Sequence, residues 1–151
     1  MQLAHYLGLL HRAQIDLGRA FREIAEAHGD EPDVAIQCTR LAEQCADHAD
    51  RLEPFVDRYG EEADDEPDRL HSELFQGTRT GPIALLRDLQ DLYLMAAECD
   101  ISWTLVGQAA QGARDEELLD VVHGCEGETA IQMQWLKSRM KQAAPQALVV
   151  A

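Results

Sequence analysis

The sequence predicts an all-α protein, a four-helix bundle of two helical hairpins joined by a long crossover. Four long segments repeat apolar residues at alternating spacings of three and four, the pattern of amphipathic helices. Helix-favouring residues dominate, and aromatic side chains make up only 5% of the chain, a mixture that disfavours a β-sandwich or barrel. With 151 residues, the chain has the length of one domain with one sizeable core.

The first two helices are expected at about residues 2–28 and 32–59. Gly29 separates them, and Pro32 fits the first turn of the second. Pro54 lies inside the second stripe, so we expect a kink or an early end there. The stripe of the first helix consists of Leu3, Leu7, Leu10, Gln14, Leu17, Phe21, Ile24 and His28.

The third and fourth helices are expected at about residues 82–111 and 114–142, with Gly112 as the break between them. We assign residues 1–144 to a single bundle domain and residues 145–151 to an apolar C-terminal tail. The stripe of the third helix consists of Leu85, Leu89, Leu92, Ala96, Cys99, Trp103, Val106 and Ala110.

The connection between the hairpins, residues 60–81, is long and begins with an acidic run at 61–66. Pro67 is a suitable start for a short helix carrying Leu70, Leu74 and Phe75, which would cover part of the apolar surface of the bundle. An up-down-up-down bundle needs only a handful of residues between helices, whereas twenty or so can cross its whole length. We therefore expect one long crossover, with an ordinary acidic loop as the alternative.

Charge and cysteine usage exclude several function classes. The chain has 28 acidic and 13 basic residues and a formal net charge of -15, which argues against nucleic acid and anionic membranes as partners. No apolar run is long enough to span a membrane, and the N-terminus lacks the features of a secretory signal. We expect a cytoplasmic protein whose four cysteines are reduced thiols.

A layer of polar residues is expected near the middle of the bundle. Pairing the helices around the first turn places Gln14 opposite Cys45 and His48. Pairing around the second turn places Cys99 opposite Cys125. Helical spacing puts Cys45 and His48 on one face. The candidate metal ligands of this layer are Cys45, His48, Cys99, Cys125 and Glu128.

The second helix carries a resemblance to a known family. Residues 42–52 read AEQCADHADRL and resemble the second helix of ferritin-like proteins of the bacterioferritin and rubrerythrin type. That resemblance implies a bundle with a di-iron site, built from a Glu on each of helices one and three and a Glu-x-x-His motif on each of helices two and four.

This chain departs from the family pattern at most ligand positions. Gln14 and Cys45 stand where the pattern has carboxylates, the inward residue of the third helix is a cysteine, and Ile131 replaces the second histidine. His48 and Glu128 match it. One histidine and one carboxylate cannot balance two iron ions in a low-dielectric core, so we expect di-iron chemistry to be lost.

Three functions follow as hypotheses. The first is a non-catalytic ferritin-like bundle that binds a protein or small-molecule partner, without a cofactor. The second is a zinc or copper protein that uses the mid-bundle thiols and imidazole, because soft ligands favour those metals. The third is a remnant di-iron oxidoreductase that uses His48 and Glu128. Against the last two stands a simpler interpretation, in which these cysteines and this histidine are ordinary core residues.

Apolar residues on the outside of the predicted helices indicate a homodimer. Leu94, Ile101 and Leu105 fall on the outer face of the third helix, where a monomer would leave them exposed. Gly124 and Gly127 lie inside the fourth helix, where glycine costs about 1 kcal/mol relative to alanine. They predict either a close approach by another helix or subunit or a local distortion.

Overall fold

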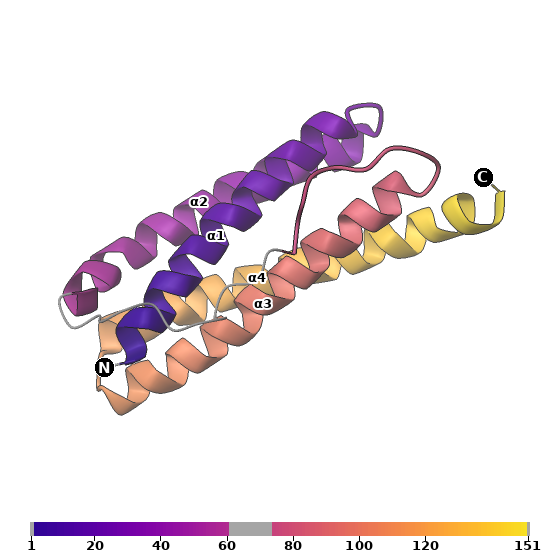
Figure 1. Ribbon diagram of the computed structural model, residues 1–151. Coiled ribbons are helices and arrows are strands. Elements are labelled where there is room, and N and C mark those ends of the chain that lie inside the picture. Colours follow the sequence, from indigo (N-terminus) through magenta and orange to yellow (C-terminus); the bar gives the residue numbers. More distant parts are fainter. Residues whose placement is uncertain (1, 61–73, 151) are drawn as a thin grey trace.

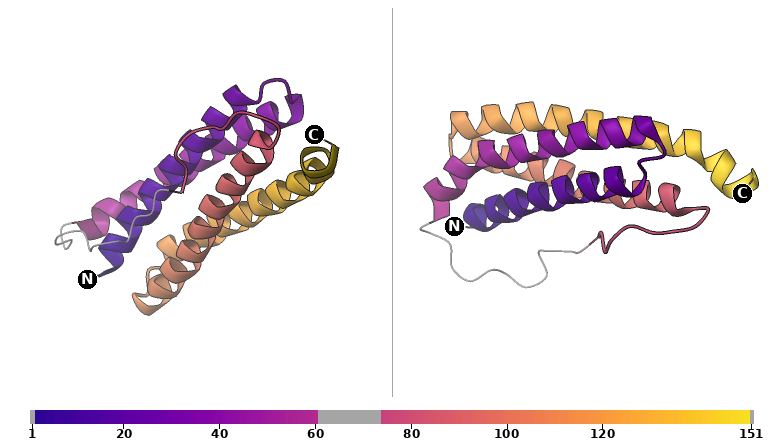
Figure 2. Two further views of the ribbon diagram at one scale, coloured as in Figure 1. Left: turned by 45° about the vertical axis from the view of Figure 1, so that its right-hand side comes forward. Right: turned by 90° about the horizontal axis from the view of Figure 1, so that it is seen from above.

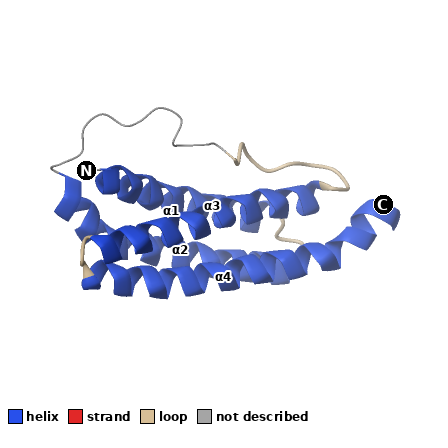
Figure 3. Ribbon diagram, turned by 90° about the horizontal axis from the view of Figure 1, so that it is seen from below, coloured by secondary structure: helices blue, strands red, loops and turns tan. Residues whose placement is uncertain are grey.

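The computed structural model describes residues 2–60 and 74–150. This part of the chain forms four α-helices followed by a short π-helical turn, and it contains no β-strand (Figure 3), so the predicted all-α class is confirmed. The elements are α1 (Gln2–Ala27), α2 (Pro32–Gly60), α3 (Ala84–Gly112), α4 (Glu116–Pro145) and η1 (Gln146–Val150).

The topology is that of two hairpins joined by one long crossover. α1 packs on α2 and α3 packs on α4, and the hairpins meet through α1 with α3 and α2 with α4 (Figures 1 and 2). Contacts at the two ends fix the directions: His28, just after α1, bonds to Asp88 near the start of α3, and Tyr59 of α2 bonds to Asp115 just before α4. α3 therefore begins at the end of the bundle opposite to the end of α2, as predicted.

The core consists of the apolar stripes of all four helices. Leu7, Leu17 and Phe21 of α1 and Leu52 of α2 are fully buried, as is Trp103 of α3. These large side chains lie at the spacings of three and four that the sequence shows. The helical periodicity therefore identified the buried face of each helix.

The bounds of α1 and α2 are close to those expected, whereas α3 begins two residues later than expected and α4 is displaced at both ends. α2 continues through Pro54 to Gly60, so of the two alternatives expected at Pro54 the early end is wrong. The lost hydrogen bond at proline is outweighed because the neighbouring Leu52 and Phe55 are buried in the core. α4 begins two residues later than predicted, because the side chain of Asp115 caps it by accepting a hydrogen bond from Leu118 N at 3.1 Å.

Only the last part of the crossover is described. The acidic run 61–66 and the predicted helix start at Pro67 lie outside the described residues, and the described residues 74–80 are not helical. Phe75 is partly buried against the core. Gly81 has a φ of 98°, which glycine adopts at low cost, and it turns the chain into Pro82 and α3.

The C-terminal segment leaves the bundle. α4 ends at Pro145, and η1 continues past the end of the neighbouring helices (Figure 2, right). Leu148, Val149 and Val150 of η1 are mostly exposed. Among the described residues, no helix is both long and apolar enough to cross a membrane.

Candidate functional site

The mid-bundle layer is centred on His48, whose side chain has no exposed area. Its Nδ1 lies 3.1 Å from Oε1 of Gln14 on α1, and its Nε2 lies 3.3 Å from Oε2 of Glu128 on α4. The Trp103 ring of α3 stands perpendicular to the imidazole, with ring centroids 5.8 Å apart. Each of the four helices thus places one side chain at this point.

The charge state of His48 follows from its surroundings. Burial lowers its pKa, which outweighs the opposing effect of the Glu128 carboxylate. The neutral ring has one N–H donor and one acceptor nitrogen. Since an ionised carboxylate can only accept, the proton belongs on Nε2, facing Glu128, and Nδ1 is left as the acceptor. A neutral His48 therefore needs a donor from Gln14.

The Gln14 amide meets that need by turning over. In the structure its Oε1 faces His48, while its Nε2 is buried with no hydrogen-bond partner among the described residues. Exchanging the two ends of the amide lets Nε2 donate one N–H to His48 Nδ1, and it puts Oε1 rather than the nitrogen at the buried position that has no partner among the described residues. The Nε1 donor of Trp103 is also buried without a partner in this part of the chain.

The four cysteines are free and buried. Burial raises the pKa of Cys38 and Cys45 to about 12 and that of Cys125 to about 11, and it also raises the pKa of Cys99. The thiols are therefore protonated at neutral pH, whereas metals bind the thiolate. Burial in these surroundings gives each cysteine the character of a small apolar side chain.

The predicted ligands do not converge on one point. The register of the first hairpin is as predicted, because Gln14 meets His48. In the second hairpin, Thr104 bonds to Glu126, and a Cβ on Gly107 would lie 3.1 Å from Val122. These contacts show that α4 is shifted along α3 by more than one helical turn relative to the predicted pairing. Cys99 is therefore not level with Cys125. Within residues 2–60 and 74–150, no three His, Cys, Asp or Glu side chains are arranged to hold a metal ion.

A second polar contact in the layer involves two glutamines that the sequence reasoning did not assign to it. Nε2 of Gln132 on α4 donates to Oε1 of Gln44 on α2 at 2.7 Å, and it lies 3.8 Å from Cys45 Sγ. Gln132 is buried on α4 at helical spacing from Cys125, Thr129 and Leu136, and its place in that stripe of the sequence was the signal for its role. It adds a further polar link between the two hairpins.

The glycines of α4 have different explanations. Gly124 lies under the guanidinium of Arg51, where a Cβ would approach Nη2 to 3.1 Å. The predicted close approach is thus made by a side chain of α2. At Gly127 a Cβ would have no neighbour within 4 Å among the described residues, and α4 is α-helical through both positions, so no local distortion accompanies them.

An ion-pair cluster at one end of the bundle was not foreseen. Asp88 is fully buried, and it accepts hydrogen bonds from His28 Nε2 at 2.8 Å and from the backbone and side chain of Arg79. The same guanidinium donates to Asp91 at 2.8 Å. The cluster fastens the end of the crossover to α1 and α3. Its sequence signal was two aspartates three residues apart beside the stripe of α3.

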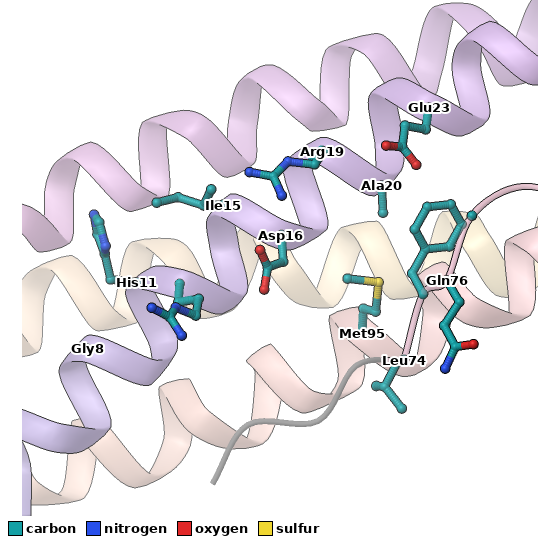
Figure 4. Close-up of a pocket in the computed structure, with 13 residues that line it drawn as sticks. Gly8, His11, Ile15, Asp16, Arg19, Ala20, Glu23, Leu74, Gln76 and Met95 are labelled. Atoms are coloured by element: carbon teal, nitrogen blue, oxygen red, sulfur yellow. The ribbon is translucent and has the colours of Figure 1, made fainter. Parts of the chain in front are cut away.

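A shallow open groove of about 890 Å³ runs along α1, beside residues 74–77 and Met95 (Figure 4). The charged residues of α1 that line it alternate in sign, so they create little net field toward a charged ligand. The four residues of that series are Arg12, Asp16, Arg19 and Glu23.

No family model, no curated protein and no solved structure matches this chain.

Proposed function

We propose that this protein is a non-catalytic, ferritin-like helical bundle that works by binding a partner, and that its lineage has lost di-iron chemistry. The observation that supports binding most strongly is the outer face of α3. Leu94, Ile101 and Leu105 are 52%, 55% and 46% exposed there. A row of large apolar side chains on one helix is typical of a surface that meets another molecule.

The chemistry of the mid-bundle layer supports the loss of iron. A di-iron site of this topology draws on carboxylates from four helices, whereas here Gln14 and His48 are uncharged and the thiols are protonated. Glu128 is the one carboxylate that reaches His48 in the described contacts. The long-crossover topology supports kinship with ferritin-like bundles, and the four free thiols favour a reducing, cytoplasmic setting.

The test is iron loading under anaerobic conditions followed by exposure to oxygen. We expect no ferroxidase absorbance, because the layer lacks the carboxylates that would hold two irons. Stoichiometric oxidation of two irons per chain would overturn the proposal and favour the remnant oxidoreductase.

Elemental analysis of protein purified without a histidine tag distinguishes the remaining alternative, a zinc or copper protein, from the proposed function. Zinc or copper near one per chain would favour a soft-metal site that includes Cys45 and His48. The arrangement of the described residues gives that alternative no further support, so it stays a prediction from sequence.

A further inference from the structure

Three buried polar atoms in the middle of the bundle have no hydrogen-bond partner among the described residues. One is the indole nitrogen Nε1 of Trp103, which can only donate. The second belongs to the Gln14 amide, and with that amide turned to serve the neutral His48 it is the acceptor Oε1. The third is the acceptor Oε1 of Gln132. All three residues are at most 1% exposed, so bulk solvent does not satisfy these atoms.

Gln14 and Trp103 lie at the same level of the bundle on neighbouring helices. α1 and α3 pack together in opposite directions, and the contact of His28 with Asp88 sets their register. Counted from that contact, Gln14 lies fourteen residues back along α1 and Trp103 fifteen residues forward along α3. At a rise of about 1.5 Å per residue, the two positions are level to within about 2 Å. Both side chains also lie against the His48 imidazole.

The Gln132 amide lies beside the same stretch of the core. Its Nε2 is 3.8 Å from Sγ of Cys45, which precedes His48 by one helical turn on α2. The contacts between α3 and α4 place Gln132 about 8 Å from Trp103 along the helix axes, toward the start of α3. Helical side chains lean toward the N-terminus of their own helix, and α3 and α4 are antiparallel. The indole and the amide therefore lean toward each other.

We propose that one water molecule is bound between these three side chains. Its oxygen accepts a hydrogen bond from Nε1 of Trp103, and its two hydrogens are donated to Oε1 of Gln14 and Oε1 of Gln132. One donor and two acceptors are the complement of a water that makes about three hydrogen bonds, the usual number for a buried water. A direct bond between Trp103 and Gln14 would leave Oε1 of Gln132 without a partner among the described residues.

The bound water completes a chain of hydrogen bonds that crosses all four helices. The chain begins at Trp103 on α3 and passes through the water to Gln14 on α1. It continues from the Gln14 amide to His48 on α2, and from His48 to Glu128 on α4. Every donor points the same way along this chain, toward the carboxylate, and hydrogen bonds in such a chain strengthen one another. The water site links the two hairpins and does not depend on the binding function proposed above.

A high-resolution crystal structure of the unmodified protein tests the site directly. We expect a water within about 3.2 Å of Nε1 of Trp103 and of the amide oxygens of Gln14 and Gln132. An indole nitrogen that bonds directly to a protein oxygen would overturn the proposal. So would three polar atoms with no water between them.

Nuclear magnetic resonance tests the same contact in solution. The chain has two tryptophans, so Trp135→Phe leaves the indole N–H signal of Trp103 alone. That signal should show a dipolar cross-peak to water in a rotating-frame experiment, where the sign separates dipolar contact from hydrogen exchange. Gln14→Met and Gln132→Met each remove one acceptor at similar volume and should weaken or abolish the cross-peak.

Thr129→Val provides the matched control. It removes a buried hydroxyl from the same stretch of α4, whose own hydrogen bond goes to the backbone oxygen of Cys125. The cross-peak should survive this change, because the proposed water does not use the hydroxyl. Loss of the cross-peak in Thr129→Val would mean that the contact is relayed through the hydroxyl proton, and the water site would be refuted. A cross-peak of full strength in both glutamine variants would refute it as well.

Discussion

His48 and Glu128 join the two hairpins of the bundle, with Nε2 of the imidazole 3.3 Å from Oε2 of the carboxylate. The imidazole has no exposed area, while the Glu128 side chain is 37% exposed. The contact therefore runs from the dry centre of the bundle to its surface. Because burial lowers the pKa of His48, the ring reaches this carboxylate as a neutral donor.

The first prediction concerns the pH dependence of stability. The pKa of His48 is lower in the folded protein than its ordinary value of 6.5, so below that value the unfolded state binds more protons. The contribution of His48 to stability is complete above about pH 6.5 and is lost as the pH falls toward the folded-state pKa.

Denaturant titrations of the unmodified protein and His48→Gln from acidic to neutral pH would measure this contribution. The unfolding free energy of the unmodified protein minus that of His48→Gln should increase as the pH rises toward 6.5. His123→Gln removes an exposed imidazole of α4 and serves as the control. A difference that shrinks with rising pH would mean that His48 is held in its charged form.

The second prediction concerns metal dependence. Cys45→Ala removes one buried sulfur and should cost about 1–2 kcal/mol, by analogy with other small truncations in cores. His48→Ala should cost more, because it leaves both Gln14 and Glu128 without their partner.

The melting temperature of the unmodified protein should be the same with and without a strong chelator. A drop of several degrees that vanishes in both variants would instead identify a metal site.

The third prediction concerns the close contact of α1 with α2 at Gly18. A Cβ there would lie 3.3 Å from Cys45 Cβ and 3.4 Å from Ala42 O, atoms held by the α2 backbone. Gly18→Ala should therefore destabilise the protein, since the two helices must separate slightly. Gly8→Ala on the same helix meets nothing described within 4 Å and should stabilise by up to about 1 kcal/mol. The melting temperatures of both variants check these two expectations. If Gly18→Ala stabilised the protein as much as Gly8→Ala, the close contact at Gly18 would not constrain the helices.

The fourth prediction concerns the buried carboxylate of Asp88. Asp88→Ala removes the acceptor of His28 and Arg79 and should cost about 3–5 kcal/mol, as when one partner of a buried ion pair is lost. Asp50→Ala on the exposed side of α2 should change stability by less than about 0.5 kcal/mol. Urea unfolding measures both, and similar small losses would show that the cluster does not fasten the crossover.

The register of the second hairpin shows why sequence reasoning failed at one point. Gly112 was taken as the centre of the turn, because glycine is the usual residue of a break between helices. In the structure Gly112 still belongs to α3, and Arg114 takes the left-handed conformation with a φ of 56°. The turn is therefore centred further along the chain than predicted. That difference changes which residue of α4 lies opposite each residue of α3.

The sequence alone determined the four helices, the buried face of each, the long crossover and the meeting of Gln14 with His48. These follow from helical periodicity and from one short turn, which are local properties of the chain. The sequence also placed Glu128 in the layer of His48, but only the tertiary structure decided that Trp103 stands against the same imidazole and that Arg79 pairs with Asp88. Periodicity fixes the face on which a side chain lies, but the axial offset between hairpins is set by side-chain packing across the whole core.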